Sequence, residues 1–324
     1  MEEKILFEAQ HIKKYFPVDN NDGKKHFLHA VDDVSFQIRK GEIFGIVGES
    51  GSGKSTIGRC LLQLLQIDSG EIYFNGKNIV NCSRKETKGL RQEMQMIFQN
   101  PISSFNPAVS LRHSFEEQAR VYGIRKNEMT RRLSELLSSV ALPWDALERR
   151  PRELSGGQMQ RLAIARALLV DPRFILADEP VSALDVSVQA QIINLLIDMC
   201  DRYEMTMAFI SHDLDIVHHL CDRAAVVYLG KIVEMAPIEE LYQHYGHPYT
   251  EMLLATNPKK HPLEKKERKI IKGEIPSAVD VKEGCRFCSR CPYAKKGLCD
   301  VKTPEFKDYG NGHFIACHNP VPSK

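Results

Sequence analysis

A glycine-rich stretch at residues 48–56, GESGSGKST, has the residue types and spacing of a phosphate-binding loop. It fits the pattern G-x-x-x-x-G-K-[ST], and its flanks agree: the apolar run at 42–47 predicts a buried strand, and the leucine-rich run at 57–65 predicts a packed helix. A strand that leads through a glycine turn into a helix surrounds an anion with backbone N–H groups, and the helix N-terminus adds partial positive charge. A chance glycine-rich turn is the alternative, but strand, helix and GKST occur together. The sequence therefore predicts that the chain binds a nucleoside triphosphate.

The residues of this loop have separate predicted roles. Its glycines permit the tight backbone, Lys54 is expected to reach the β- and γ-phosphates, and the Ser55 hydroxyl is expected to ligate Mg²⁺. The predicted nucleotide-binding residues of the loop are Gly48, Ser50, Gly51, Gly53, Lys54, Ser55 and Thr56.

Several polar side chains follow predicted strands and have the types needed to assist hydrolysis. Asp178 ends a buried run and suits a Mg²⁺ contact, and Glu179 comes next, placed to polarise a water aimed at the γ-phosphate. Gln99 could contact Mg²⁺ or water, and His212 also follows an apolar run. Taken singly, each also fits a plain structural role at a strand end, and a lone histidine is more often structural.

The segment LSGGQ at residues 154–158 is a second candidate anion site. It opens a strongly helical segment at 159–170, so Ser155, Gly157 and Gln158 fall where small residues, exposed N–H groups and the helix dipole coincide. The structural alternative is that Ser155 is simply the N-cap of the helix.

The elements that must position these residues alternate between strands and helices. Residues 5–7 and 31–38 predict strands ahead of the phosphate-binding loop, and residues 70–76 predict a strand that enters an Asn-Gly turn. Residues 108–150 are charged and periodic without β-branched runs, which predicts a helical insertion.

Composition is that of an ordinary globular protein of 324 residues, with 43% apolar residues, 27% charged residues and a net charge of +2. No apolar run approaches the roughly 18 to 20 residues that a membrane helix needs. The first residues, MEEK, lack the apolar segment of a secretory signal. We therefore expect a cytosolic chain whose membrane role, if it has one, works through a partner.

The nine cysteines divide into two groups. Cys60, Cys82, Cys200 and Cys221 lie scattered in apolar or helical segments and are predicted to be buried thiols. The others cluster near the C-terminus, at Cys285, Cys288, Cys291, Cys299 and Cys317. In a reducing compartment such clustering points to metal rather than to disulfides.

The order of the motifs resembles that of an ATP-binding cassette (ABC) ATPase. The phosphate-binding loop is followed by Gln99, LSGGQ, FILADE at 174–179, SALD at 182–185 and His212, and the resemblance covers residues 5 to about 240. It implies an α/β fold: a P-loop NTPase (RecA-like) core, an N-terminal antiparallel β subdomain, a helical signature subdomain and a small cysteine-rich C-terminal extension. It also implies a head-to-tail dimer in which each ATP lies between one subunit's P-loop and the other's LSGGQ.

The same resemblance implies roles for individual residues. Gln99 is the nucleotide-sensing residue that faces the membrane partner, Asp178 the Mg²⁺ acid, Glu179 the catalytic base and His212 the residue that holds the γ-phosphate. Tyr15 matches the adenine-stacking position, with the adjacent Phe16 as the alternative.

A narrower resemblance lies outside the common cassette. Residues 99–107, 247–254, 273–277 and 284–287 are similar to oligopeptide/dipeptide importer ATPases, and residues 91–98 resemble the second ATPase subunit of the permease. It implies a heterodimer with another ABC ATPase subunit, two transmembrane permease subunits, an extracytoplasmic substrate-binding protein, and a peripheral position on the cytoplasmic face of the membrane. Ile102 and Ala108 depart from the family's pattern near the coupling surface, and nickel and glutathione importers share the architecture.

The C-terminal cysteines resemble the iron–sulfur ligand pattern of this subfamily. The implied ligands of a [4Fe–4S] cluster are Cys285, Cys291, Cys299 and Cys317, whereas Cys288 is an extra thiol. By chemistry alone the four thiolates suit structural Zn²⁺ equally well. The basic segment at 259–272 is expected to be a solvated surface.

We expect an ABC ATPase domain at residues 1–245, with a helical subdomain at about 100–165, and the extension at 246–324. A soluble ABC protein that acts on ribosomes or DNA is the rival, but those types carry tandem cassettes or a long coiled coil, and the sequence has one P-loop and a short insertion. A second rival is a zinc-ribbon nucleic-acid binder, which the near-neutral charge does not support, and we expect no nucleic-acid partner.

Overall fold

The computed structural model describes residues 4–19, 24–256 and 275–321. The chain divides into two compact units. The first unit contains residues 1–80 and 211–324, and the second contains residues 81–210. The basic segment at 259–272 lies outside the described residues.

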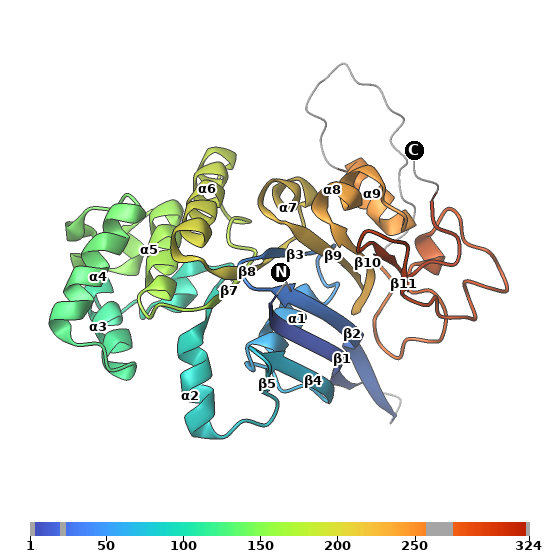
Figure 1. Cartoon of the computed structure of the whole chain (residues 1–324), viewed down its shortest axis with the longest axis horizontal. Coiled ribbons are helices and arrows are strands. Elements are labelled where there is room, and N and C mark those ends of the chain that lie inside the picture. Colours follow the sequence, from blue (N-terminus) through green and yellow to red (C-terminus); the bar gives the residue numbers. More distant parts are fainter. Residues whose placement is uncertain (1–3, 20–23, 257–274, 322–324) are drawn as a thin grey trace, which may run out of the picture. The chain divides into compact units, whose positions relative to one another are not determined.

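The first unit contains a four-stranded antiparallel sheet in the order β2-β1-β4-β5 (Figure 1). Its strands are β1 (Ile5–Asp19), β2 (Lys25–Arg39), β4 (Ser69–Phe74) and β5 (Lys77–Asn78). Phe7 of β1 packs against Phe74 of β4, with ring centroids 5.0 Å apart. The predicted Asn-Gly turn joins β4 to β5, and both turn residues have positive φ, 48° at Asn75 and 77° at Gly76.

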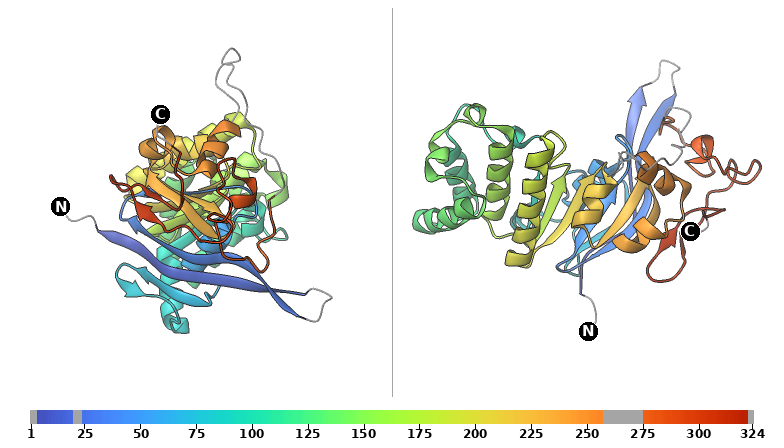
Figure 2. Two further views of the ribbon diagram at one scale, coloured as in Figure 1. Left: turned by 90° about the vertical axis from the view of Figure 1, so that its right-hand side faces the viewer. Right: turned by 90° about the horizontal axis from the view of Figure 1, so that it is seen from above.

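A second set of strands in the first unit leads into the phosphate-binding loop. Strand β3 (Ile43–Val47) is fully buried and runs parallel to β9 (Arg223–Tyr228), which turns back into β10 (Lys231–Pro237). The C-terminal segment continues this layer, because β12 (Phe314–Ile315) pairs with β10 and β11 (Lys307–Asp308) pairs with β12. Figure 2 shows this segment in red along the orange strands. The helices of the unit are α1 (Lys54–Leu61), α7 (Leu214–Leu220), α8 (Ile238–Gln243) and α9 (Pro248–Thr256).

The second unit combines a parallel sheet with helices. Strand β7 (Phe174–Asp178) lies between β6 (Met94–Ile97) and β8 (Thr206–Ser211), and both pairings are parallel. All five residues of β7 are buried, which explains its unbroken apolar sequence. The helices of the unit are α2 (Arg84–Glu93), α3 (Leu111–Val121), α4 (Lys126–Ser139), α5 (Gly156–Leu168) and α6 (Val186–Tyr203). Helices α3 and α4 form the predicted insertion between β6 and α5. Within the described ranges, no helix combines the length and the apolar character needed to cross a membrane.

The buried carboxylate of Glu234 in β10 organises the chain that follows α8. It accepts hydrogen bonds from the backbone N–H of Gly246 at 2.6 Å and of His247 at 3.0 Å, and it contacts the Nε2 of His313 at 2.7 Å. The Thr250 hydroxyl donates to it as well. Since Glu234 has no exposed surface, these donors replace the water that the carboxylate has lost. Through these hydrogen bonds, α9 and the C-terminal segment that contains β11 and β12 are both attached to Glu234 of β10.

A second buried charge links the start of β3 to β9. The guanidinium of Arg223 lies 3.1 Å from the carboxylate of Glu42, and the two side chains are only 11% and 5% exposed. Burial raises the pKa of the Glu42 carboxyl. Substituting Arg223 by methionine should leave this carboxylate buried without its cation, and the free energy of unfolding should fall by about 3 kcal/mol.

Urea unfolding of the full chain measures this effect. Arg112→Ala is the control, because the Arg112–Glu148 pair is 28% and 60% exposed and exposed pairs contribute about 1 kcal/mol or less. Equal midpoints for the two variants would contradict a stabilising role for the buried pair.

Candidate active site

The predicted phosphate-binding loop joins β3 to α1 in the expected strand–turn–helix arrangement. Gly53 is the N-cap of α1 and has a φ of +104°, and a Cβ at this position would lie 2.2 Å from the carbonyl oxygen of Ala30. Only glycine fits there. No side chain of the described residues caps the helix at this residue, so the first N–H groups of α1 are not taken up by a side-chain cap. This is the geometry of an anion site at a helix N-terminus.

Lys54 begins this helix and reaches back over the loop. Its side chain is 4% exposed, and Nζ donates to the carbonyl oxygens of Gly48 at 2.7 Å and Glu49 at 2.8 Å. The ammonium group is therefore held inside the loop, where phosphate oxygens would meet it. Ser55 and Thr56 are half-buried in the first turn of α1, and the loop tip at residues 50–51 is exposed.

The two candidate adenine-stacking rings have different surroundings. The Tyr15 hydroxyl donates to Asp32 at 2.5 Å, and its ring stacks on His29 with centroids 4.2 Å apart. Burial, together with the bond to Asp32, raises the pKa of Tyr15. The Phe16 ring lies instead under the ammonium of Lys14, 5.4 Å from its centroid. One face of Tyr15 is thus already covered by His29.

The predicted hydrolytic carboxylate lies at the end of β7 in the second unit. Asp178 is 4% exposed, and Glu179 follows it with a φ of +46°, which is uncommon for a residue with a side chain. The backbone N–H of Glu179 donates to Ile210 at 3.0 Å, which fixes this conformation. The Nε2 of Gln99 donates to the Glu179 carboxylate at 3.0 Å and to the Ser182 hydroxyl at 3.3 Å. The structure therefore brings the predicted sensing residue and the predicted base into direct contact.

The LSGGQ segment begins α5 of the same unit. Ser155 is the N-cap: its hydroxyl accepts from the N–H of Gln158 at 3.3 Å, and the Gln158 side chain accepts from the N–H of Ser155 at 3.0 Å. The structural alternative for Ser155 is thus present. It does not displace the anion-site prediction, because Ser155 and Gly156 are exposed at the helix N-terminus. A Cβ on Gly157 would lie 2.7 Å from a methyl group of Val188, which explains the glycine.

His212 lies in the first unit, between the end of β8 and the N-cap of α7. Its side chain is exposed, and the next residue, Asp213, caps α7 by accepting from the backbone N–H of Asp215 at 2.9 Å. The predicted residues therefore divide between the units. The phosphate-binding loop, Tyr15 and His212 belong to the first unit, and the second unit contains Gln99, Ser155, Gly157, Gln158, Asp178 and Glu179.

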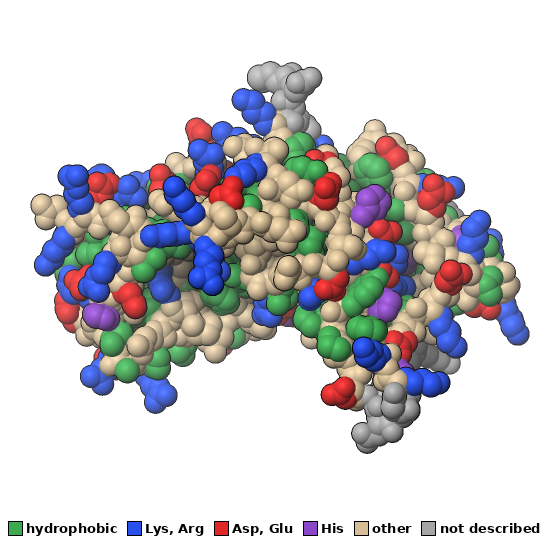
Figure 3. Space-filling view, turned by 90° about the horizontal axis from the view of Figure 1, so that it is seen from below, with side chains coloured by type: hydrophobic (Ala, Val, Ile, Leu, Met, Phe, Trp, Pro, Cys, Tyr) green, Lys and Arg blue, Asp and Glu red, His purple; other side chains and the backbone are tan. Residues whose placement is uncertain are grey.

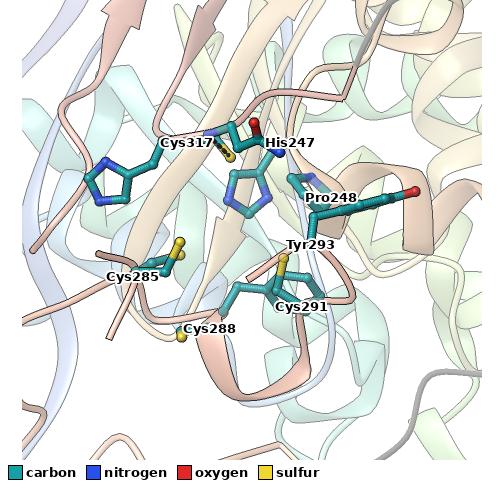
Figure 4. A pocket seen from close by; sticks show the side chains of 11 residues that line it. His247, Pro248, Cys285, Cys288, Cys291, Tyr293 and Cys317 are labelled. Carbon is teal, nitrogen blue, oxygen red and sulfur yellow. Dashed lines mark hydrogen bonds between the residues drawn. The ribbon is translucent and has the colours of Figure 1, made fainter. Parts of the chain in front are cut away.

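The five C-terminal cysteines line one small cavity of about 10 Å³, together with His247 and Phe287 (Figure 4). The thiols that cluster near the end of the sequence therefore also lie close together in the fold. Their placement does not confirm the predicted ligand set, however, since no group of three or more His, Cys, Asp or Glu residues in the described part of the chain could hold a metal ion as the side chains stand. Burial raises the pKa of Cys285 to about 12 and that of Cys291 to about 11, as expected for thiols without a cation.

Backbone hydrogen bonds distinguish four of these sulfurs from the fifth. The sulfur of Cys317 accepts from the N–H of Asn319 at 3.3 Å, and that of Cys299 accepts from the N–H of Lys295 at 3.3 Å. The sulfurs of Cys285 and Cys291 each accept from the backbone two residues further on. Among the described residues, no such bond to Cys288 is found. Backbone N–H groups aimed at sulfur are typical of thiolates that bind iron–sulfur clusters.

His247 adds a further donor to this cavity. Its Nδ1 accepts from the N–H of Tyr249 at 3.0 Å, and burial lowers its pKa to about 4, so the ring is neutral and carries its proton on Nε2. That buried Nε2 finds no partner among the residues that the structure describes. The cavity thus combines thiols with N–H groups that are either directed at sulfur or unused among the described residues.

The sequence did not predict the residues, distant along the chain, that contact the phosphate-binding loop. Arg290 forms an ion pair with Glu49, and Tyr249 accepts a hydrogen bond from the Glu49 backbone. Arg286 pairs with Asp32, the partner of Tyr15. One signal was available: Glu49 places a carboxylate in a loop built for phosphate, and such a charge needs a cation nearby.

Sequence comparison places these features in a family. Residues 31–182 match the ABC transporter family, and residues 233–299 match the family described as oligopeptide/dipeptide transporter, C-terminal region. The oligopeptide transport ATP-binding protein AppF of Bacillus subtilis is 44% identical over 322 residues, which cover 98% of this chain and 98% of that protein. The chain belongs to the ABC transporter family. It is an ATPase of that family, for which ATP and Mg²⁺ are the expected ligands.

Further relatives and solved structures agree with this membership. A putative peptide import ATP-binding protein of Brucella ovis is 46% identical over 90% of this chain and 92% of its own length. Among solved structures, cbiO1 of Clostridium perfringens, part of the ABC transporter complex cbiONQ, superposes with a TM-score of 0.65 at 27% identity, covering 75% of this chain and 92% of that one. The ATP-binding cassette MJ0796 bound to ADP and Pi gives a TM-score of 0.63 at 25% identity, over 72% and 99% of the two chains. The predicted RecA-like α/β core is confirmed.

Charge is distributed without a strong bias on the face drawn in Figure 3. Basic and acidic side chains are interspersed there, in keeping with a net charge of +2.

Proposed function

We propose that this ABC ATPase hydrolyses ATP to energise the import of peptides through a membrane permease. The observation that carries the substrate class is the match of residues 233–299 to the C-terminal region of oligopeptide/dipeptide transporters. These residues include most of β10, all of α9 and four of the five cysteines of the cavity, and they lie beyond the cassette motifs. The relatives named for oligopeptide or peptide transport favour peptides over nickel or glutathione, the alternatives that share this architecture.

The predicted residues have separate proposed roles in ATP binding and hydrolysis. The N–H groups of the loop and of α1, with Lys54, bind the phosphates, while Ser55, Gln99 and Asp178 hold Mg²⁺. Glu179 orients and deprotonates the attacking water, and His212 holds the γ-phosphate. Tyr15 or Phe16 stacks on adenine.

The proposed assembly is a transporter in which two cassettes close head to tail over ATP. The exposed N-terminus of α5 supports this arrangement, because Ser155, Gly157 and Gln158 are available to the γ-phosphate bound by the other cassette. The partners are a second ABC ATPase subunit, two transmembrane permease subunits and, indirectly, an extracytoplasmic substrate-binding protein. The chain would lie on the cytoplasmic face of the membrane.

Uptake in living cells tests the substrate class. A strain that lacks this gene should lose accumulation of a labelled peptide and should retain uptake of labelled nickel and glutathione. The wild-type gene should restore peptide uptake, whereas a Glu179→Gln gene should not. Loss of nickel or glutathione uptake instead would reassign the substrate.

We further propose that residues 1–245 are the cassette, with a helical subdomain at about 100–165, and that residues 246–324 form an extension bearing an iron–sulfur cluster. Cys285, Cys291, Cys299 and Cys317 would hold a [4Fe–4S] cluster, supported by the backbone donors to these sulfurs and by the free Nε2–H of His247. A cluster there would stabilise the fold of the extension and its attachment to the cassette. Zn²⁺ is the alternative for the same thiolates.

Metal analysis of anaerobically purified protein separates these possibilities. We expect brown protein with about four iron and four sulfide per chain. Cys317→Ser should abolish the colour and loosen the tail. Cys288→Ser, the matched control, should keep the colour, because no backbone donor to this sulfur is found among the described residues. Colourless protein that binds one zinc would favour Zn²⁺, and iron loss in both variants would make Cys288 a ligand.

A further inference from the structure

The phosphate-binding loop contains a carboxylate that should oppose its function. Glu49 is the second residue of the loop, adjacent to Gly48, and its carbonyl oxygen accepts from the Nζ of Lys54. A negative side chain this close to bound phosphates raises the free energy of the complex unless it is neutralised. The structure supplies the cation from far along the chain.

Arg290 neutralises Glu49 through a two-point contact. Its two terminal nitrogens lie 2.6 Å and 3.0 Å from the two carboxylate oxygens, although the residues are 241 positions apart. The Arg290 side chain is 7% exposed, and its guanidinium lies over the rings of Tyr228 and Phe287, at 5.9 Å and 6.0 Å. A fork of this kind fixes both the charge and the direction of the carboxylate.

Tyr249 of α9 holds the backbone of the same residue. Its hydroxyl oxygen accepts from the N–H of Glu49 at 2.8 Å, and its side chain has no exposed surface. The rings of Tyr249 and Tyr228 pack with centroids 4.6 Å apart, so the hydroxyl cannot easily move away. The side chain and the backbone of Glu49 are therefore both set by residues that lie after position 245.

We propose that Arg290 and Tyr249 are positioning residues for ATP binding, which act through Glu49 to neutralise and pre-order the phosphate-binding loop of their own chain. Arg290 lies between Cys288 and Cys291, so the segment that carries it is anchored at the cysteine cavity. The extension thus has a function in the nucleotide site of the cassette. This inference rests on ATP binding by the loop and not on the identity of the transported substrate.

The segment that carries Arg290 also contacts the residues around Tyr15, the predicted adenine-stacking ring. The guanidinium of Arg286 pairs with Asp32, which accepts the hydrogen bond from Tyr15, and it donates to the carbonyl oxygen of Leu229. Both arginines of the segment therefore support parts of the predicted nucleotide pocket.

Titration of the full chain with a non-hydrolysable ATP analogue and Mg²⁺ tests the proposal. Arg290→Met should raise the dissociation constant about tenfold, because it leaves the Glu49 carboxylate unpaired beside the phosphates. Adding Glu49→Gln to Arg290→Met should recover most of the affinity, since the repelling charge is then gone. A role confined to folding would not be rescued by this second substitution.

Arg223→Met is the matched control, because it breaks another buried arginine–glutamate pair of the same unit, the pair formed with Glu42 before β3. It should lower stability and leave the dissociation constant unchanged at a temperature where the variant is folded. Wild-type affinity in Arg290→Met, or no recovery in the double variant, would overturn the proposal. Failure of the wild-type chain to bind the analogue would instead count against the proposed ATP site.

Discussion

Substituting Glu179 by glutamine is expected to lower ATP turnover by a factor of roughly 10² or more while MgATP still binds. Glutamine preserves the shape of the side chain but cannot accept the proton of the attacking water. The surroundings should tolerate it, because the unusual backbone at Glu179 is fixed by its own N–H bond to Ile210, which the substitution keeps.

Single-turnover and steady-state hydrolysis by the reconstituted transporter measure this effect. Glu93→Gln serves as the control, since this carboxylate of the same unit is half-buried, with a side chain 41% exposed, and pairs only loosely with Arg173 at 3.4 Å. If a second type of cassette is present, each of the two ATP sites must be scored separately. Near-normal hydrolysis at sites that contain only the glutamine variant would rule out Glu179 as the base.

Substituting Ser155 by arginine is expected to abolish ATP-driven dimerisation while leaving nucleotide binding by the P-loop measurable. The new side chain places bulk and positive charge at the exposed N-terminus of α5, where the γ-phosphate of the other cassette would bind. The substitution also removes the bond from the Gln158 N–H to the serine hydroxyl, a loss of about 1 kcal/mol that is too small to unfold the unit.

Light scattering with ATP and Mg²⁺ detects this dimer. Ser155→Ala removes the same cap without the bulk, and it should still dimerise, although more weakly. An arginine variant that dimerises like the wild-type protein would show that this helix end does not face the nucleotide.

The local sequence pattern was sufficient to predict those parts of the fold whose residues are contiguous in the sequence. The strand–turn–helix at Gly53 and Lys54 was predictable because the turn, the helix start and the reactive groups are contiguous. The same holds for β7 and Glu179, where an unbroken apolar run identifies a buried strand and the next residues provide the carboxylates. Most of the predicted nucleotide site is of this kind.

The long N-terminal strands were only partly predictable. The sequence predicts a strand at residues 5–7, but β1 continues to Asp19, and its pairing with β2 contains several register shifts. Positive φ values at His11 and Asp33 accompany these irregularities, and they break the alternation of apolar and polar residues on which the prediction depends. The sequence did not predict helix α2. This helix has no buried residue, so its sequence lacks the apolar stripe by which a packed helix is identified.

Long-range polar pairs were beyond local pattern altogether. The contact of Glu49 with Arg290 joins residues 241 positions apart, and Glu234 gathers donors from α9 and from His313. A carboxylate in the phosphate-binding loop indicates that a cation is needed, but residue type and spacing do not identify which residue supplies it. That depends on which strands and loops become neighbours in the folded chain.

Peptide transport in proteoliposomes tests the central claim most directly. The chain is reconstituted with the cassette and permease subunits that co-purify with it from membranes, and accumulation of a labelled peptide is followed with the substrate-binding protein present. We predict accumulation that requires ATP and Mg²⁺ and that stops when Glu179 is replaced by glutamine. Peptide accumulation that continues without ATP, or ATP hydrolysis that no peptide stimulates in the complete assembly, would contradict the account.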